Sequence, residues 1–294
     1  PDIVHLVTIK PVLLGGIASR LASVPAVVSA ISGLGFTFHG KGFIFSLRRK
    51  LISLFYYLSL GHMNQKIIFQ NNDDKLKLSQ IGKNINNRSV LIQGSGVDLS
   101  LYSVVENNFN SPVIMMAARL LSSKGVREFV QASKIVRTNN KNVRFVLVGD
   151  TDPLNPESIK KSEISQWKED GLVEIWGYRS DMSNVIPKAN VIVLPSYYGE
   201  GLPKVLIEAA ACGRVVITTD HPGCRDAITR KTGVLIPIKD SEALADAILD
   251  LLQNPQKAIK MGEAGRALAE QKYAIEKVCE KHITIYKDLL TKTA

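Results

Sequence analysis

Short runs of β-branched and other apolar residues alternate along the chain with longer amphipathic stretches. The short runs predict strands near residues 3–8, 26–31, 66–70, 90–93, 113–118, 143–148, 173–176, 191–195, 215–218 and 233–236. Several runs, such as Val-Ile-Val-Leu at 191–194, show no polar alternation, which is typical of parallel strands buried on both faces. Because the longer stretches predict connecting helices, we expect an α/β fold of the doubly wound kind.

The predicted strands are too many for one typical sheet, and the pattern breaks between residues 95 and 112. This segment is polar and rich in turn-forming residues. The expected parts are, in chain order, a first Rossmann-like domain (1–98), an interdomain linker (99–112), a second Rossmann-like domain (113–270) and a C-terminal helix (271–294). We expect the final helix to pack back towards the first domain.

The chain begins Pro-Asp-Ile-Val-His, without an initiator Met and without the basic segment of a signal peptide. Residues 2–8 already resemble a buried strand, so this start resembles the middle of a protein. We therefore expect the first domain to be incomplete.

Composition and charge narrow the class of protein. The 45% hydrophobic and 22% charged residues are typical of a globular protein, and no run approaches the ~20 apolar residues of a membrane span. Cys212, Cys224 and Cys279 lack metal-site spacing, which indicates reduced thiols in a cytoplasmic protein. The net charge of +10 favours an anionic partner. Since the cations are dispersed and no nucleic-acid motif occurs, we expect no nucleic-acid partner.

Residues 41–60 combine bulky apolar side chains with the basic triplet Arg48-Arg49-Lys50. Such a segment suits the surface of an anionic membrane and would give peripheral contact with it. It suits equally well a helix that packs on its own sheet and exposes its basic residues to water. The sequence leaves both interpretations open.

The segment from Leu194 to Gly213 has the strongest pattern of a ligand site. A buried strand ends there, Glu200 follows between two glycines, and Pro203 stands where a helix can begin. Glycine lets the backbone approach a ligand closely. The free N–H groups of a first helical turn suit a phosphate.

Glu208 lies in the helix that this segment predicts, among residues that are nearly all apolar, so the helix should be buried. A buried carboxylate without a partner is energetically costly. The two hydroxyl groups of a ribose could satisfy Glu208. A buried Arg or Lys, or an escape of the side chain to solvent, could do so as well.

Arg119 and Lys124 follow the first strand of the second domain. Two cations beside a helix start suit a diphosphate, and they would stabilise the charge that grows on a leaving group. The alternative is two solvated surface cations. Asp150-Thr151-Asp152 has the spacing of a metal-binding motif, but we interpret it as an ordinary loop after a strand. The five histidines show no metal-ligand spacing.

At this point the residues resemble a known family. Glu200 and Glu208, eight positions apart after Pro-Ser-Tyr-Tyr-Gly, resemble the E-x7-E signature of retaining GT-B glycosyltransferases, family 4, also called glycosyltransferase group 1. Arg119 with Lys124 resembles that family's phosphate-binding pair. Residues 1–5 and 90–98 resemble its N-terminal domain and the approach to its linker, so the likeness covers essentially the whole chain. Residues 199–226 further resemble the branch that extends polyprenyl-diphosphate-linked sugars in bacterial surface glycans.

The resemblance implies a GT-B-like fold with two Rossmann-type domains facing across a cleft. It implies that Glu208 holds the donor ribose, Glu200 contacts the donor sugar, and Arg119 and Lys124 hold the diphosphate and help it leave. Gly201, Leu202 and Pro203 would contribute backbone groups, and Tyr178 and Arg179 fall where the family passes the nucleobase. No protein nucleophile, metal or other cofactor is implied.

Two departures from the family concern the acceptor side. Ser32 stands where many members carry a His, and His39 lies further along. The Gly-rich loop near the family's N-terminus has no counterpart in this chain. The first departure means that the sugar and acceptor contacts of the family's His are not expected from Ser32. The second leads us to expect that the chain as given binds donor but turns over poorly.

The implied function is a hexosyltransferase that moves a hexose or N-acetylhexosamine, with retention, from a nucleotide-sugar donor, UDP-sugar favoured, to a saccharide acceptor. The branch favours a polyprenyl-diphosphate-linked acceptor, in polysaccharide biosynthesis at the inner face of the cell membrane. The alternatives are a donor-binding remnant or regulatory subunit without turnover, and another GT-B enzyme such as a nucleotide-sugar epimerase or a sugar phosphorylase.

Overall fold

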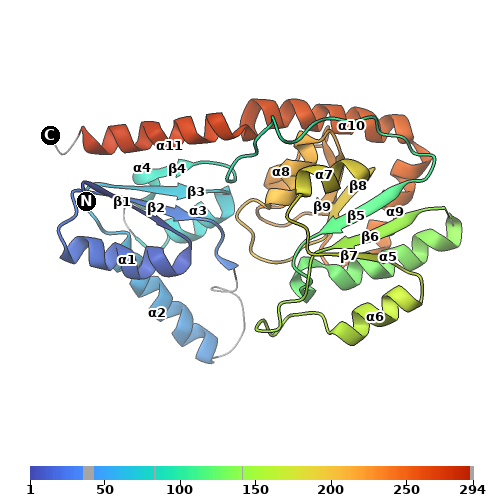
Figure 1. Ribbon diagram of the computed structural model, residues 1–294. Helices are drawn as coiled ribbons and strands as arrows, with labels where there is room; N and C mark the ends of the chain where they lie inside the picture. The colour runs from blue at the N-terminus through green and yellow to red at the C-terminus, as the bar shows by residue number, and fades with distance from the viewer. Residues whose placement is uncertain (36–42, 83, 141, 292–294) are drawn as a thin grey trace. The chain divides into compact units, whose positions relative to one another are not determined.

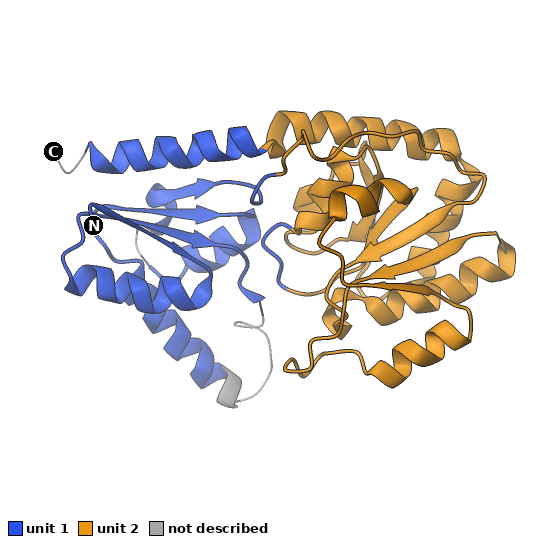
Figure 2. Cartoon of the chain, viewed as in Figure 1, with its two compact units in different colours: residues 1–96, 199–202, 275–294 blue, residues 97–198, 203–274 orange. Residues whose placement is uncertain are grey.

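The computed structural model describes residues 1–35, 43–82, 84–140 and 142–291, without the side chains of residues 43–45 (Figure 1). The chain forms two compact units (Figure 2). Unit 1 comprises residues 1–96, 199–202 and 275–294, and unit 2 comprises residues 97–198 and 203–274. His39 and Lys41, considered above, lie outside the described residues.

Unit 1 is built on a four-stranded parallel sheet in the order β1-β2-β3-β4. Its strands are β1 (Ile3–Val7), β2 (Ala26–Ile31), β3 (Gln65–Phe69) and β4 (Ser89–Leu91). Its helices are α1 (Ile9–Leu21), α2 (Phe43–Ser59), α3 (Asn72–Ser79), α4 (Ile85–Arg88) and α11 (Ile275–Leu290).

The pleat of β2 explains why helices cover both faces of this sheet. Val27 and Ile31 belong to one core with residues of α1 and α2, among them Val12 and Tyr56. The alternate residues of β2, starting with Ala26, belong to a second core with α11. Successive side chains of a strand point to opposite faces, so a strand like β2, apolar on both faces except for Ser29, requires a cover on each side.

Unit 2 is built on a six-stranded parallel sheet in the order β10-β9-β8-β5-β6-β7. Its strands are β5 (Val113–Ala117), β6 (Arg144–Val148), β7 (Glu174–Gly177), β8 (Val191–Leu194), β9 (Val215–Thr219) and β10 (Gly233–Ile236). Its α-helices are α5 (Val126–Asn139), α6 (Lys161–Glu169), α7 (Met182–Val185), α8 (Lys204–Ala211), α9 (Ser241–Gln253) and α10 (Pro255–Leu268). Short 3₁₀ turns at Ser122–Lys124, Ile186–Lys188 and Arg225–Ala227, and a π-helical turn at Ala269–Tyr273, complete it.

The strand order of unit 2 places β5 between β6 and β8. Numbered within the unit, the order is 3-2-1-4-5-6, that of a doubly wound dinucleotide-binding fold. The chain reverses direction across the sheet between β5 and β8, and ligands of such sheets bind beyond the strand ends at that point. The α/β class, the parallel sheets and every strand predicted from the sequence are therefore confirmed.

Candidate functional site

A pocket of about 210 Å³ lies in unit 2 at the carboxyl ends of the central strands. Three successive strand exits and α8 form its walls. The lining residues are Ala117, Ala118 and Arg119 after β5, Val148, Gly149 and Asp150 after β6, Tyr178, Arg179 and Met182 after β7, and Val205 and Glu208 on α8. This is the position that the strand order indicates for a ligand.

The backbone closes tightly at Gly149. Its φ is +134°, and a Cβ there would lie 1.9 Å from the carbonyl oxygen of Ala118. Only glycine tolerates both the backbone conformation and the close approach. The exits of β5 and β6 therefore form a continuous backbone wall of the pocket.

Glu208 is held inside unit 2 by a tyrosine far away in sequence. The Tyr102 hydroxyl donates a hydrogen bond of 2.7 Å to Oε1 of Glu208, whose exposed fraction is 6%. Lys204 Nζ lies 3.6 Å from the same oxygen, one helical turn away. Burial and the neighbouring Glu208 carboxylate raise the pKa of Tyr102, so the phenol remains a donor.

Tyr102 is itself fixed by Arg266 on α10. Arg266 Nη1 donates 2.7 Å hydrogen bonds to the backbone oxygens of Tyr102 and Ala211. The arginine thus joins the segment that carries Tyr102 to the C-terminal end of α8, where carbonyl groups lack helical partners. The result is a buried carboxylate with a fixed direction at the pocket wall.

Arg119 brings a positive charge to the pocket, as Arg179 does. Its Nη1 lies 3.0 Å from Oδ2 of Asp152, and its side chain is 56% exposed. The charge is therefore available to a ligand that can compete with one partly exposed carboxylate, which exposed ion pairs permit at little cost.

Lys124 lies in the 3₁₀ turn Ser122–Lys124 and does not line the pocket. Its Nζ stands 5.2 Å from the ring centroid of Tyr198, a cation–π contact. Tyr178 and Arg179, which follow β7, line the pocket. Arg179 donates two 2.7 Å hydrogen bonds to Asp181, and this pairing lowers the pKa of Asp181 to about 2.

Glu200, Gly201 and Leu202 belong to unit 1, whereas Pro203 precedes α8 in unit 2. Asn71 Nδ2 lies 3.1 Å from the backbone oxygens of both Glu200 and Gly201. The Leu202 N–H donates to Gln70 Oε1 at 3.0 Å. Four of the candidate residues therefore line one pocket, namely Arg119, Tyr178, Arg179 and Glu208.

Three residues at the site are not among those that the sequence predicts for it, namely Tyr102, Asp150 and Asp152. Tyr102 lies in the expected linker, and nothing local distinguishes it from other linker residues. Asp150 and Asp152 do form a loop, as interpreted above, but Asp150 lines the pocket and Asp152 pairs with Arg119. The sequence does contain a signal for Asp150 and Asp152, because both lie in the loop after a predicted parallel strand. The residues that follow adjacent parallel strands meet at one edge of the sheet, where ligands bind.

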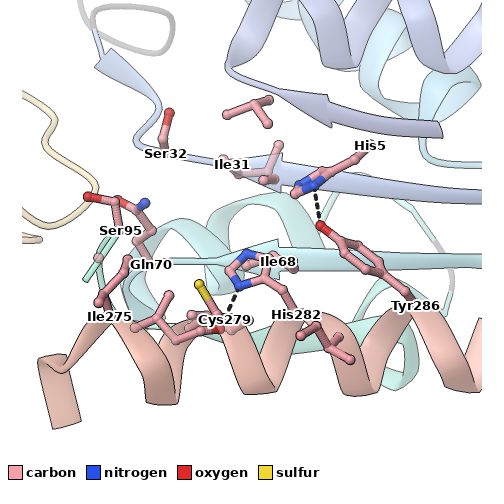
Figure 3. Close-up of a pocket in the computed structure, with 16 residues that line it drawn as sticks. His5, Ile31, Ser32, Ile68, Gln70, Ser95, Ile275, Cys279, His282 and Tyr286 are labelled. Atoms are coloured by element: carbon pink, nitrogen blue, oxygen red, sulfur yellow. Dashed lines mark hydrogen bonds between the residues drawn. The ribbon is translucent and has the colours of Figure 1, made fainter. Parts of the chain in front are cut away.

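Unit 1 has a cavity of its own, of about 430 Å³, between its sheet and α11 (Figure 3). Its lining is mainly apolar, with Ser32 and Gln70 at one end. At the other end, His5 Nδ1 lies 2.8 Å from the hydroxyl of Tyr286. Burial, reinforced by the nearby His282, lowers the pKa of His5, so this histidine is neutral at pH 7.

Neither a metal-binding cluster nor a membrane-spanning helix occurs in the part of the chain that the structure describes. The described residues contain no group of three or more His, Cys, Asp or Glu side chains arranged to hold a metal ion. None of the helices within the described ranges combines the length and the apolar character that crossing a bilayer needs.

Family models match most of the chain. Residues 111–254 match the model described as "Glycosyl transferases group 1". Residues 1–71 match the model described as "Glycosyl transferase 4-like".

Curated relatives match at modest identity. The chain is 27% identical over 299 residues to the N,N'-diacetylbacillosaminyl-diphospho-undecaprenol alpha-1,3-N-acetylgalactosaminyltransferase of Campylobacter jejuni, covering 97% of this chain and 76% of the relative. It is 28% identical over 266 residues to the UDP-Gal:alpha-D-GlcNAc-diphosphoundecaprenol alpha-1,3-galactosyltransferase of Escherichia coli. That match covers 84% of this chain and 65% of the relative.

Solved structures share the fold. Anabaena Alr3699/HepE in complex with UDP superposes with a TM-score of 0.81 at 19% identity, covering 98% of this chain and 79% of that chain. Sucrose-phosphate synthase from Thermosynechococcus elongatus superposes with a TM-score of 0.83 at 21% identity, covering 99% of this chain and 74% of that chain. The predicted GT-B fold is thereby confirmed.

Proposed function

We propose, from the premise that this chain belongs to the group 1 glycosyltransferases, that its unit 2 pocket binds the nucleoside diphosphate of a sugar donor. The observation that carries the proposal is the buried, fixed carboxylate of Glu208 in the same pocket as the cation of Arg119. The two charges fit opposite parts of one ligand: a diol at the carboxylate and a diphosphate at the guanidinium.

The ribose is assigned to Glu208. Tyr102 occupies Oε1, and an ionised carboxylate offers acceptor sites on both oxygens. A cis-diol donates two hydroxyl hydrogens, so it satisfies the remaining acceptor sites of a buried group that would otherwise be costly. A deoxyribose or an acyclic ligand would leave part of this capacity unused.

The diphosphate is assigned to Arg119, with Lys124 as its partner. In this proposal the phosphate oxygens displace Asp152 from Arg119 and draw Lys124 from the face of Tyr198. The interaction grows stronger as the C1–O bond of the donor breaks and charge collects on the departing diphosphate, which is the condition for catalysis rather than mere binding. These cations supply the electrostatic stabilisation, so we propose no resident metal.

The reaction is a transfer of a hexose or N-acetylhexosamine with retention at the anomeric carbon. The acceptor hydroxyl oxygen forms the new bond to C1, the C1–O bond to the diphosphate breaks, and the acceptor proton passes to a diphosphate oxygen. Glu200 is proposed to contact the hydroxyls of the donor sugar, with backbone groups of Gly201, Leu202 and Pro203 nearby. Tyr178 and Arg179 are proposed to flank the base.

UDP is the proposed carrier, and a polyprenyl-diphosphate-linked saccharide is the proposed acceptor. The E. coli relative is named as a UDP-Gal enzyme, and both relatives carry diphospho-undecaprenol or diphosphoundecaprenol in the names of their acceptors. Because both proteins are relatives of this chain, the donor and acceptors in their names support the proposal. Such an acceptor also implies work at the inner face of the cell membrane.

The proposal is tested by incubating the purified chain with radiolabelled UDP-sugars and polyprenyl-diphosphate-linked saccharides. We expect one donor to label the lipid fraction and the product to show the donor's anomeric configuration by proton NMR. Transfer should persist in a metal chelator. Inverted product would refute the stereochemical proposal, and donor binding without transfer would favour a binding subunit.

A further inference from the structure

Helix α2 of unit 1 exposes a row of leucines on the side away from its own core. Tyr56 and Ser59 are fully buried, and Ile52 packs against the same core. On the opposite side of the helix, Leu47, Leu51, Leu54 and Leu58 have exposed fractions of 53%, 51%, 52% and 40%. Their spacing of four, three and four residues places them on one stripe of the helix. We call these four residues the leucine face.

Helix α1 packs against α2 and holds it in place (Figure 1). Arg20 Nη1 donates a 2.8 Å hydrogen bond to the backbone oxygen of Leu58, which joins the last turns of both helices. Next to Arg20, Leu21 is 84% exposed. The leucine face is therefore a fixed part of the folded unit.

The charged residues of α1 and α2 are all positive: Lys10 and Arg20 on α1, and Arg48, Arg49 and Lys50 on α2. Residues 3–72 contain seven Lys or Arg and no Asp or Glu. On α2, Arg48 and Lys50 are exposed and lie on either side of the leucine stripe, since they follow Leu47 by one residue and precede Leu51 by one. An apolar stripe between cations is the pattern of a helix that lies in a membrane interface.

We propose that the leucine face, flanked by Arg48 and Lys50, docks unit 1 onto the surface of an anionic lipid bilayer. The leucines would enter the boundary between headgroups and acyl chains, and the cations would bind lipid phosphates. The alternative partner of the leucine face is a second copy of the chain. Pairing two such helices would bring their cations together without any carboxylate from residues 3–72 to neutralise them.

Docking would bring unit 1 to the surface where a lipid-linked saccharide lies. In this respect the inference deepens the proposed function, but it depends on α1 and α2 and not on the nucleotide pocket. A variant that loses vesicle binding and keeps nucleotide binding separates the two proposals.

The test is sedimentation of the purified chain with phosphatidylcholine vesicles, with and without phosphatidylglycerol. We expect binding only to the anionic vesicles. Leu51→Ser with Leu54→Ser should weaken it about tenfold, because two half-exposed leucines no longer insert. Arg48→Glu with Lys50→Glu should weaken it at least about 25-fold, at about fivefold for each cation removed.

The matched controls lie in unit 2. Leu154→Ser removes a leucine that is 97% exposed, and Lys161→Glu with Lys168→Glu changes the net charge as much on exposed positions of α6. Both controls should bind vesicles nearly as the unchanged chain does. Equal losses in these controls, or equal binding to both kinds of vesicle, would overturn the proposal. A dimer in sedimentation velocity that Leu51→Ser with Leu54→Ser dissolves, without vesicle binding, would assign the face to a second copy.

Discussion

Replacing Tyr102 with phenylalanine removes one hydroxyl and tests how the pocket holds its carboxylate. The ring of Tyr102 is buried at 9% exposure, and phenylalanine preserves that packing. The lost interaction is the 2.7 Å hydrogen bond to Oε1 of Glu208. Hydrogen bonds to charged groups contribute about 1.5–3 kcal/mol, so the free energy of unfolding should fall by that amount.

Nucleotide binding should weaken as well, because the Glu208 carboxylate would have to be ordered again when the ribose arrives. Ordering one such side chain costs about 0.5–1.5 kcal/mol, which corresponds to about a two- to tenfold higher Kd. In a transfer assay we expect the loss in KM with kcat little changed, since the ribose does not react.

The assay pairs urea unfolding with calorimetric titration of UDP for the unchanged chain, Tyr102→Phe and Tyr57→Phe. Tyr57 is 57% exposed, so its hydroxyl should contribute little to either quantity. If Tyr102→Phe is less stable but binds UDP with unchanged affinity, the hydrogen bond stabilises the fold and Tyr102 does not position Glu208 for the nucleotide. Unchanged stability would refute the interaction itself.

Three further predictions concern other parts of the chain. Gly149→Ala should lower the free energy of unfolding by more than about 3 kcal/mol in urea melts, because its Cβ would lie 1.9 Å from the Ala118 carbonyl oxygen; a stable variant would contradict the tight wall. Burial raises the pKa of Asp74 to about 6, so the folded state binds this proton more tightly than the unfolded chain does. The free energy of unfolding should therefore fall by up to about 3 kcal/mol as the pH rises from about 4 to about 6. Asp74→Asn should flatten that dependence on pH. Cys279 is exposed and should react with a thiol reagent, whereas Cys212, whose pKa burial raises to about 12, should react only after unfolding.

Much of the fold was predictable because its signal is local. The apolar runs of β5 and β8 show that both strands are buried on two faces, and Gly213, with a φ of +65°, ends α8 where the sequence predicts. The order of strands in the sheet is not local information. It requires the pairing of β5 with β8 across residues 118–190.

The candidate site divides in the same way. The burial of Glu208 follows from its apolar neighbours on one helix, and its exposed fraction of 6% confirms it. Its partner Tyr102 is 106 positions away in the sequence, so the contact between them is visible only in the folded structure. For α2, the helical period is visible in the sequence, but the outward direction of the leucines depends on which side packs against the core of unit 1.

The most direct test of the central claim is calorimetric titration of the chain with UDP, GDP and uridine, repeated for Glu208→Ala and Arg119→Ala. We predict binding of UDP in preference to GDP, a large loss of UDP and uridine binding in Glu208→Ala, and a loss of UDP but not uridine binding in Arg119→Ala. Folded protein that binds neither diphosphate, or UDP affinity that Glu208→Ala leaves unchanged, would contradict a nucleotide-sugar site in the unit 2 pocket.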